Sequence, residues 1–182
     1  MNDIGRSRSL IGAFAGIAAL VLTVGAAAAS GASHASATIV DGTGTTVGTA
    51  TFTEDSAGRV HVNVHVEGLA PGLHGTHLHA VAQCVGPAFT SAGGHHNPLA
   101  AQHGLESALG AHAGDLPNLT VNVAGRGHLD ATSDLATLSS GPVSLFDADG
   151  SAIVIHALED DQLTNPTGNS GARVACDVLT AY

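Results

Sequence analysis

The chain has 182 residues, of which 11% are charged and 3% are aromatic, and its five arginines stand against 15 acidic residues, with no lysine. A formal net charge of −10 excludes a basic nucleic-acid groove, because such a groove needs several cationic side chains to displace phosphate counterions. The length suits one domain, and a hydrophobic content of 44% argues against disorder. The twelve histidines outnumber the lysines and arginines together, so the placement of the histidines is the informative feature.

The chain begins with the pattern of an export signal. Arg6 and Arg8 precede an uncharged run over residues 10–24, and small residues follow that run. A positive segment, an apolar segment and an Ala-x-Ala ending are typical of a secretory signal peptide. The alternative is a retained membrane anchor, because residues 10–29 are long enough to cross a bilayer.

Cleavage of this signal is expected after Ala29 or after Ala37. The signal peptide then covers residues 1–37, and a single mature domain covers residues 38–182. The predicted location is extracytoplasmic, which means secreted, periplasmic or on the cell surface.

Export also bears on the two cysteines, Cys84 and Cys176. Outside the cytosol such a pair is expected to form a disulfide. The bond would close a long loop, for which the chain-entropy model gives a stabilisation of roughly 2–5 kcal/mol.

Short strands are predicted along the mature chain. The clearest covers residues 60–66, where four valines alternate with polar residues at the period of a half-buried strand. Clusters of Asp, Gly and Pro separate the candidates, and strands at this spacing indicate an all-β antiparallel sandwich or barrel. In chain order they are expected at 47–53, 60–66, a segment ending at His79, 119–123, 127–132, 142–146, 152–156 and 173–179.

Two long segments, residues 80–117 and 157–172, do not fit this pattern. Loops of that length inside a compact domain are unusual and are generally functional.

Histidines gather around these two loops. His77 and His79 are two apart on a strand, so both point to one side while Leu78 points into the core. Imidazole favours copper and zinc, and three histidines with one carboxylate can complete a zinc tetrahedron. The alternative for any single one of them is a solvated surface histidine. The remaining members of the predicted metal site are His95, His103, His112, Asp115 and His156.

Five motifs, in order, resemble those of the copper–zinc superoxide dismutases, and together they span nearly all of the mature chain. GLHGTHLH resembles the first copper motif, SAGGHHNP the bridging-histidine motif, and HG followed by HAGDL the zinc loop. His156 with Asp160 resembles the last copper ligand and its supporting carboxylate. GNSGARVAC resembles the active-site arginine motif with its disulfide cysteine. These segments are residues 72–79, 91–98, 103–104 with 112–116, 156–160 and 168–176.

The resemblance implies a Greek-key β-sandwich, or flattened barrel, with two long functional loops and two metal ions. Copper, cycling between Cu2+ and Cu+, would take His77, His79, His95 and His156. Zn2+ would take His95, His103, His112 and Asp115, so that His95 bridges the two metals.

The resemblance also implies roles for two residues beyond the ligands. Asp160 would accept hydrogen bonds from one copper and one zinc histidine. Arg173 would hold the substrate anion beside copper. The implied reaction is the disproportionation of superoxide to dioxygen and hydrogen peroxide, with Arg173 and His95 as catalytic residues. The implied partner is superoxide, with no nucleic acid and no stable membrane partner unless the leader is retained, and the chain would be a monomer or a homodimer.

Two other functions remain open. The first is a non-enzymatic copper or zinc buffer or chaperone built on the same fold. The second is an adhesive or carbohydrate-binding sandwich whose histidines are incidental, although 3% aromatic residues leave few platforms for sugars. The histidines outside the metal motifs are expected to be solvated, structural, packed beside the site or part of the leader; they are His61 and His65, His74, His96 and His34, with no role foreseen for His128.

Overall fold

The computed structural model describes residue 1 and residues 32–182. The proposed leader, including the cleavage position after Ala29, lies outside the described residues except for its last segment. Within the described part, no helix is both long and apolar enough to cross a membrane.

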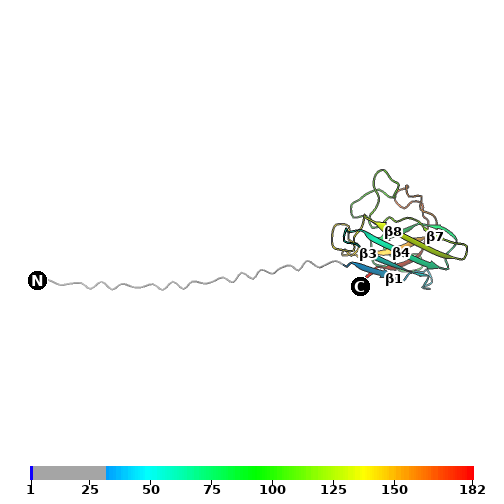
Figure 1. The fold of residues 1–182 in the computed structure, drawn as a ribbon, viewed down its shortest axis with the longest axis horizontal. Coiled ribbons are helices and arrows are strands. Elements are labelled where there is room, and N and C mark those ends of the chain that lie inside the picture. The colour runs from blue at the N-terminus through cyan, green and yellow to red at the C-terminus, as the bar shows by residue number, and fades with distance from the viewer. Residues whose placement is uncertain (2–31) are drawn as a thin grey trace.

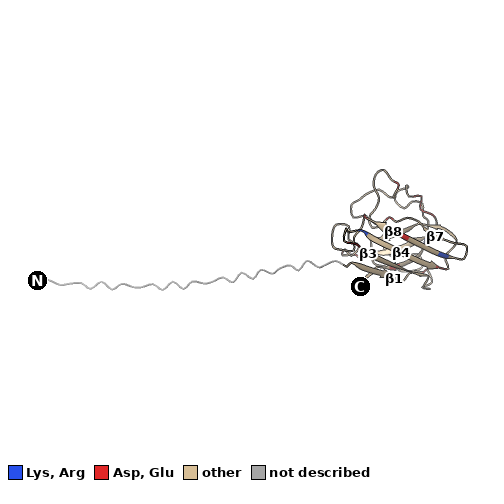
Figure 2. Ribbon diagram, viewed as in Figure 1, with Lys and Arg blue, Asp and Glu red and all other residues tan. Residues whose placement is uncertain are grey.

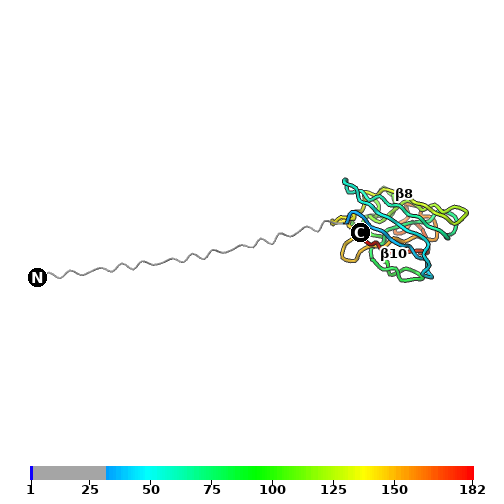
Figure 3. The backbone as a smooth tube through the Cα atoms, turned by 60° about the horizontal axis from the view of Figure 1, so that its bottom comes forward, coloured from blue at the N-terminus to red at the C-terminus, as the bar shows by residue number. Residues whose placement is uncertain are grey.

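Two antiparallel sheets pack face to face in the described part of the chain (Figure 1). The larger sheet has the order β11-β1-β3-β4-β8-β7-β5, and the smaller has the order β2-β10-β9-β6. Figure 3 shows β8 of the larger sheet and β10 of the smaller sheet on opposite sides of the body. The strands are β1 (His34–Ala37), β2 (Val40–Asp41), β3 (Gly48–Glu54), β4 (Val60–Glu67), β5 (Gly72–His74), β6 (Thr76–His79), β7 (Leu119–Val121), β8 (Arg126–Ser133), β9 (Ala152–His156), β10 (Arg173–Val178) and β11 (Thr180–Ala181), with one 3-10 turn, η1 (Thr90–Ala92).

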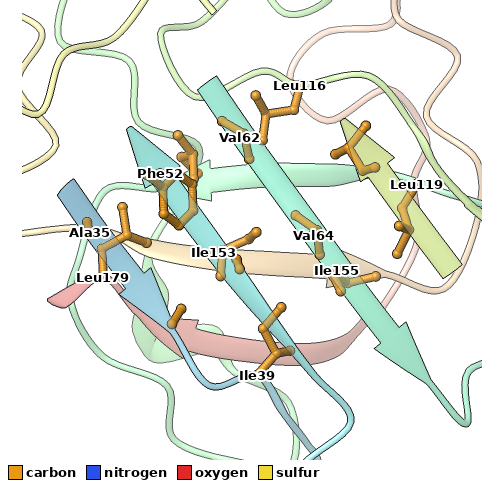
Figure 4. Packing of buried hydrophobic residues seen from close by; sticks show 14 of the residues in the cluster. Ala35, Ile39, Phe52, Val62, Val64, Leu116, Leu119, Ile153, Ile155 and Leu179 are labelled. Carbon is orange, nitrogen blue, oxygen red and sulfur yellow. The ribbon is translucent and has the colours of Figure 1, made fainter. Parts of the chain in front are cut away.

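The core lies between the sheets, where alternation along each strand places the apolar side chains. In β4 the four valines are buried, and the residues between them are exposed or half-buried. Figure 4 shows Phe52, Val62 and Val64 of the larger sheet meeting Ile153 and Ile155 of the smaller one. Each such side chain contributes roughly 1.5–3 kcal/mol when fully buried. The sandwich prediction is confirmed.

The chain connections are those of a Greek key. β3 and β4 form a hairpin, but β4 then pairs along its whole length with β8 rather than with β5. β5 lies beyond β7 at the far edge of the same sheet. A strand that returns beside an earlier one through a long connection defines this topology.

Gly75 lets the chain change sheets between β5 and β6. Its N–H donates to the carbonyl of Leu158, and its own carbonyl accepts from the N–H of His156. A Cβ at this position would lie 2.7 Å from Cβ of Ser170, so only glycine fits the close approach of the two segments. The change of sheet starts β6, the strand that carries His77 and His79.

The segment 142–146 is not a strand, and that prediction was wrong. It forms turns, and its one ladder contact is an isolated bridge between Thr137 and Ser144. The segment folds back on Thr137, whose N–H donates to the carbonyl of Val143 and whose carbonyl accepts from the N–H of Leu145. The carboxylate of Glu54 holds the preceding loop by accepting from the backbone N–H groups of Leu138 and Ser139, both at 2.6 Å. Leu145 is buried as an anchor of that loop rather than as part of a ladder.

The sheet begins ahead of residue 38, with β1. Ala35 and Ala37 are buried between β3 and β11, and His34 pairs with Thr53. The ring of His34, a residue of the predicted leader, stacks on that of Tyr182 with centroids 5.8 Å apart. The sequence does not predict this strand, because Ala and Ser have little preference for β-strands.

The two long loops are present as predicted and lie against each other. The N–H of Glu106, in the first loop, donates to the carbonyl of Gln162, in the second. In Figure 1 the green and salmon loops gather above β7 and β8. The predicted disulfide is confirmed: Cys84 and Cys176, with Cα atoms 5.8 Å apart, tie the first loop to β10.

Candidate metal centre

The outer edge of β6 positions the first loop. Leu78 donates its N–H to the carbonyl of Gly114 and accepts from the N–H of His96. Isolated bridges then set His77 opposite Asp115 and His79 opposite His95. A short continuation of the sheet thus brings loop residues beside the two strand histidines, and Leu78 points into the core as expected.

Four histidines converge at one end of this arrangement: His77, His79, His95 and His156. All are buried, and one ligand atom from each lies within 4.8 Å of the others. Among the described residues, Nδ1 of His77 and Nε2 of the other three are buried without a hydrogen-bond partner. An unsatisfied buried polar atom costs about 1–3 kcal/mol, so four that converge form a cradle suited to a cation.

The other ring nitrogens of these histidines are held by the protein. Nδ1 of His79 lies 3.0 Å from the carbonyl of Gly93, and Nδ1 of His156 lies 3.3 Å from that of Gly171. A ring that donates there presents a free lone pair at Nε2. Burial lowers the pKa of His77 to about 4, that of His79 to about 2 and that of His156 to about 3. The rings are therefore neutral at pH 7, as metal ligands must be.

A second cluster surrounds one oxygen of Asp115. Nδ1 atoms of His95 and His103 each lie 3.0 Å from Asp115 Oδ1, and Nδ1 of His112 lies 3.3 Å from it. Nδ1 of His112 is also 3.3 Å from Nδ1 of His95. Three ring nitrogens and a carboxylate oxygen in this arrangement are the donors of a tetrahedral zinc site.

The backbone supports Asp115 from the other side. Its Oδ2 accepts from the N–H groups of Gly104 at 2.8 Å and His112 at 2.9 Å. Burial alone would raise the pKa of Asp115, but the hydrogen bonds from His103 and His95 hold it well below the usual range. The carboxylate is therefore charged at pH 7 and can receive a cation.

His77 lies between the two clusters. With His95, His103 and Asp115 it also forms a group whose ligand atoms lie within 4.8 Å, and its ring stacks on His95 with centroids 3.9 Å apart. Its Nε2 is already taken by Asp160 at 2.7 Å. The partner-free Nδ1 therefore places His77 with the first cluster.

Asp160 joins the two clusters from behind. Its Oδ2 accepts from Nε2 of His77, and its Oδ1 accepts from Nε2 of His103 at 3.0 Å. Burial lowers the pKa of His103, but hydrogen bonds to Asp115 and Asp160 outweigh this and raise it to about 9. At Gly168 (φ +60°) a Cβ would overlap Oδ1 of Asp160 and lie 2.7 Å from Nε2 of His103, so this carboxylate needs a glycine beside it.

Arg173 lies opposite His156 of the first cluster in the register of β9 and β10. Its two terminal nitrogens donate to backbone carbonyls, to Phe89 at 2.6 Å and to Gly93 at 2.5 Å. It shares a surface hollow with four small residues. A guanidinium fixed by carbonyls keeps its charge available to an anion. The small residues are Ala88, Thr90, Gly171 and Ala172.

The chain was compared with known proteins. The family model for copper/zinc superoxide dismutase matches residues 46–179. The copper–zinc superoxide dismutase of Caulobacter vibrioides is 41% identical over 148 residues, which is 80% of this chain and 84% of the relative. The superoxide dismutase-like protein YojM of Bacillus subtilis is 40% identical over 143 residues, 78% of this chain and 73% of the relative. A crystal structure of a dismutase-like protein from Bacillus subtilis superposes with a TM-score of 0.74 at 38% identity, covering 78% of this chain and 95% of that one.

The chain belongs to the copper/zinc superoxide dismutase family. The matched region contains every residue of the two histidine clusters, together with Asp160 and Arg173. The part of the chain that matches the family model is therefore the part that forms the two clusters.

Two further histidines lie near the site of this family member without joining it. His74 is buried, and its ring nitrogens lie 2.6 Å from the carbonyl of His156 and 2.8 Å from that of Ala70, as expected of a structural residue. His96 is buried beside the centre, where burial lowers its pKa. The negative charge of Asp147 and a hydrogen bond with the backbone of Val143 act against this lowering of its pKa.

Sequence reasoning missed Asn118 and Gln162, which hold Asp160 in place. The side-chain amide of Asn118 donates to the carbonyl of Asp160, and its oxygen accepts from the N–H of Asp160, both at 2.8 Å. Gln162 donates its own N–H to Asp160 Oδ1 at 2.7 Å. Nothing in their spacing distinguishes them from surface amides, because their role depends on how the second loop folds back.

Proposed function

We propose that this protein is an enzyme that disproportionates superoxide to dioxygen and hydrogen peroxide, with copper in the first cluster and zinc in the second. The observation that carries the proposal is the division of His95. Its Nδ1 belongs to the cluster around Asp115, while its Nε2 faces the first cluster without a partner. One ring therefore serves both clusters.

The donor sets fit these two ions. Four imidazole nitrogens suit copper, and three imidazoles with a carboxylate suit zinc. Bound copper would supply the one-electron redox chemistry that no side chain offers, and bound zinc a fixed positive charge. The copper ligands would be His77, His79, His95 and His156, and the zinc ligands would be His95, His103, His112 and Asp115.

His95 can hold a proton at Nε2 when that atom is not a ligand. The reaction consumes two superoxide anions and two protons, so a proton donor beside the substrate is required. Because Nδ1 stays on the Asp115 side, the ring keeps its orientation while Nε2 gains or loses the proton. His95 would thus deliver a proton towards the reduced oxygen species.

Arg173 would bind the anion. Its planar fork of donors is held by the carbonyls of Phe89 and Gly93, so little side-chain entropy is lost when an anion binds. Asp160 would keep the rings of His77 and His103 in the orientation that both clusters need.

The second candidate is a non-enzymatic copper and zinc binder on the same fold. The relative YojM favours considering it, because that protein is named dismutase-like. The feature that distinguishes a dismutase from a non-enzymatic metal binder is Arg173, because a metal buffer needs no residue to bind a substrate anion.

Metal content measured together with superoxide turnover tests the proposal. We expect the wild-type chain to bind copper and zinc and to consume superoxide catalytically, and His95→Ala to lose about 10²–10⁴-fold in turnover. His61→Ala, which removes an exposed histidine, is the matched control and should keep full activity. A fully metallated wild-type protein that leaves superoxide untouched would establish the metal binder instead.

For export, we propose cleavage after Ala29 rather than after Ala37. Cleavage after Ala37 would remove β1, whose residues Ala35 and Ala37 are buried in the sheet. A chain starting at Ser30 should unfold at a higher temperature than one starting at Thr38. If the two chains unfold at the same temperature, this cleavage position loses its support.

A further inference from the structure

Two histidines outside the metal centre face each other on the outer surface of the larger sheet. His65 of β4 and His128 of β8 are direct partners in the antiparallel register. Both are exposed, and their rings stack with centroids 4.5 Å apart and planes inclined by 23°. β4 and β8 pair over eight residues, so the backbone beneath the two rings is fixed.

The surroundings of His128 orient its outer nitrogen. Nδ1 of His128 lies 3.2 Å from the carbonyl of Val64, and donation there leaves the lone pair of Nε2 facing outward. A carboxylate stands nearby, since Oδ2 of Asp130 lies 4.0 Å from that Nε2. Asp130 is two residues along the strand and therefore on the same face.

We propose that His65 and His128 form a second, surface metal site that takes a divalent transition-metal ion, with Cu2+ bound most tightly. Two imidazoles on neighbouring strands can chelate one ion, and copper leads the divalent series with such ligands. The exposed ring of His65 can turn about its Cβ–Cγ bond to aim Nε2 at the ion, while His128 keeps its contact with the carbonyl of Val64. The carboxylate of Asp130 supplies a negative charge beside the ion.

The whole molecule favours a cation at this surface. The net charge is −10, so metal cations are attracted to it at low ionic strength. Arg126 stands two residues before His128 in β8, but it is paired with Glu67 at 3.4 Å, and most of the ribbon facing the viewer in Figure 2 is uncharged. The inference does not depend on the proposed function of the buried centre.

His61 provides a matched control on the same face. It lies four residues before His65 in β4, but its ring nitrogens are engaged by Thr132 Oγ1 at 3.0 Å and Asp55 Oδ2 at 3.2 Å. It is opposite Thr132 rather than a histidine. Removing His61 therefore changes the histidine count without changing the chelating pair.

The test is a Cu2+ titration of the full mature chain whose buried centre has already been filled with copper and zinc. Wild type should bind one further Cu2+ per chain, with an electron paramagnetic resonance spectrum showing nitrogen ligands. His65→Ala and His128→Ala should each weaken this binding at least tenfold, whereas His61→Ala should leave it unchanged. Equal binding by wild type and both pair variants would overturn the proposal.

A second measurement covers the case in which a variant fails to fold. Substoichiometric Cu2+ added to the filled wild-type protein should broaden the imidazole resonances of His65 and His128 before those of His61 and His34. Broadening spread evenly over all exposed histidines would show adventitious binding only and would also overturn the proposal. Superoxide turnover is recorded separately, so a failure of the buried centre cannot be mistaken for a failure of the surface site.

Discussion

At the scale of single residues, the hydrogen bond made by one ring nitrogen of each histidine decides whether the other nitrogen is free to bind a metal ion. Carbonyls of Gly93 and Gly171 engage Nδ1 of His79 and His156, and Asp160 engages Nε2 of His77. In each ring the opposite nitrogen is left facing the first cluster. The tautomers are thus set before any ion arrives, which lowers the cost of binding one.

Replacing Asp160 with asparagine should weaken metal binding at both clusters. Asp160→Asn removes the charge that accepts from His77 and His103, and loss of such a supporting carboxylate typically costs about 10–100-fold in metal affinity. Competition titrations with chelators measure the effect for copper and zinc separately. Glu159→Gln changes the same charge at the exposed neighbouring residue and should leave both affinities intact. An effect of equal size in the two variants would contradict the assignment.

The two clusters should respond differently to pH during metal uptake. The pKa of His103 is raised to about 9 in the metal-free protein, so at pH 7 its proton competes with zinc. The copper-side rings of His77, His79 and His156 have pKa values of about 4, 2 and 3 and are already neutral. Zinc affinity should therefore fall as pH decreases from 9 to 6, by about tenfold per unit, whereas these three copper-side rings add no such pH dependence to copper affinity.

Calorimetric titrations of the metal-free chain at pH 6, 7 and 8 check this difference. In buffers of different ionisation enthalpy, zinc binding at pH 7 should release a proton to the buffer, and copper binding should release none from those three rings. A zinc affinity that does not change between pH 6 and 8 would contradict the raised pKa of His103.

The residues of the two clusters could be predicted from the sequence, because imidazoles and carboxylates at metal-ligand spacing are rare enough to form a pattern. His77 and His79 also follow from strand periodicity alone. Asn118 could not be predicted, because an amide is common on surfaces and its contacts with the backbone of Asp160 arise only once the second loop has folded.

At the scale of elements, the first long loop is held at three places. β6 hydrogen-bonds to it through Leu78, the disulfide fixes it to β10 at Cys176, and Arg173 of β10 donates to its carbonyls. The loop therefore behaves as an extension of the smaller sheet, and its histidines are held in place by their attachment to the strands.

Removing the disulfide should loosen this extension. The double variant Cys84→Ser, Cys176→Ser opens a loop whose ends are 92 residues apart, for which the chain-entropy model gives a loss of about 2–5 kcal/mol. Turnover per bound copper should fall as well, because the carbonyls that hold Arg173 belong to the freed loop. Chemical denaturation and activity assays on the metallated variant measure both effects. Unchanged stability together with unchanged activity would contradict this role.

The elements could be predicted where burial alternates strongly and not elsewhere. The alternating valines of residues 60–66 predict a strand, and the structure has β4 there. The 142–146 segment has strand-like residues, but the backbone groups of Val143 and Leu145 hydrogen-bond to Thr137 of the preceding loop, so the segment forms turns. β1 was overlooked because its four residues, HASA, carry little β preference.

At the scale of the whole molecule, charge should set how superoxide reaches the site. Loss of the first 29 residues removes one acid and two arginines, which changes the net charge from −10 to −11. A negative field repels an anion at long range. In the hollow beside Gly171 and Ala172, Arg173 is the charged member of the lining, so attraction is confined to short range.

The rate of superoxide consumption should therefore depend only weakly on salt. Added salt screens the long-range repulsion and the short-range attraction together, so their changes partly cancel. Steady-state turnover measured from low to physiological ionic strength checks this expectation. A steep fall in rate with salt would show that a stronger attractive field guides the anion than Arg173 alone supplies.

The proposed sharing of His95 between copper and zinc is tested most directly by diffraction from metal-loaded crystals, with anomalous data collected at the copper and zinc absorption edges. We predict a copper ion about 2 Å from Nε2 of His95 and a zinc ion about 2 Å from its Nδ1. A single ion, or two ions of which only one contacts this ring, would contradict the account.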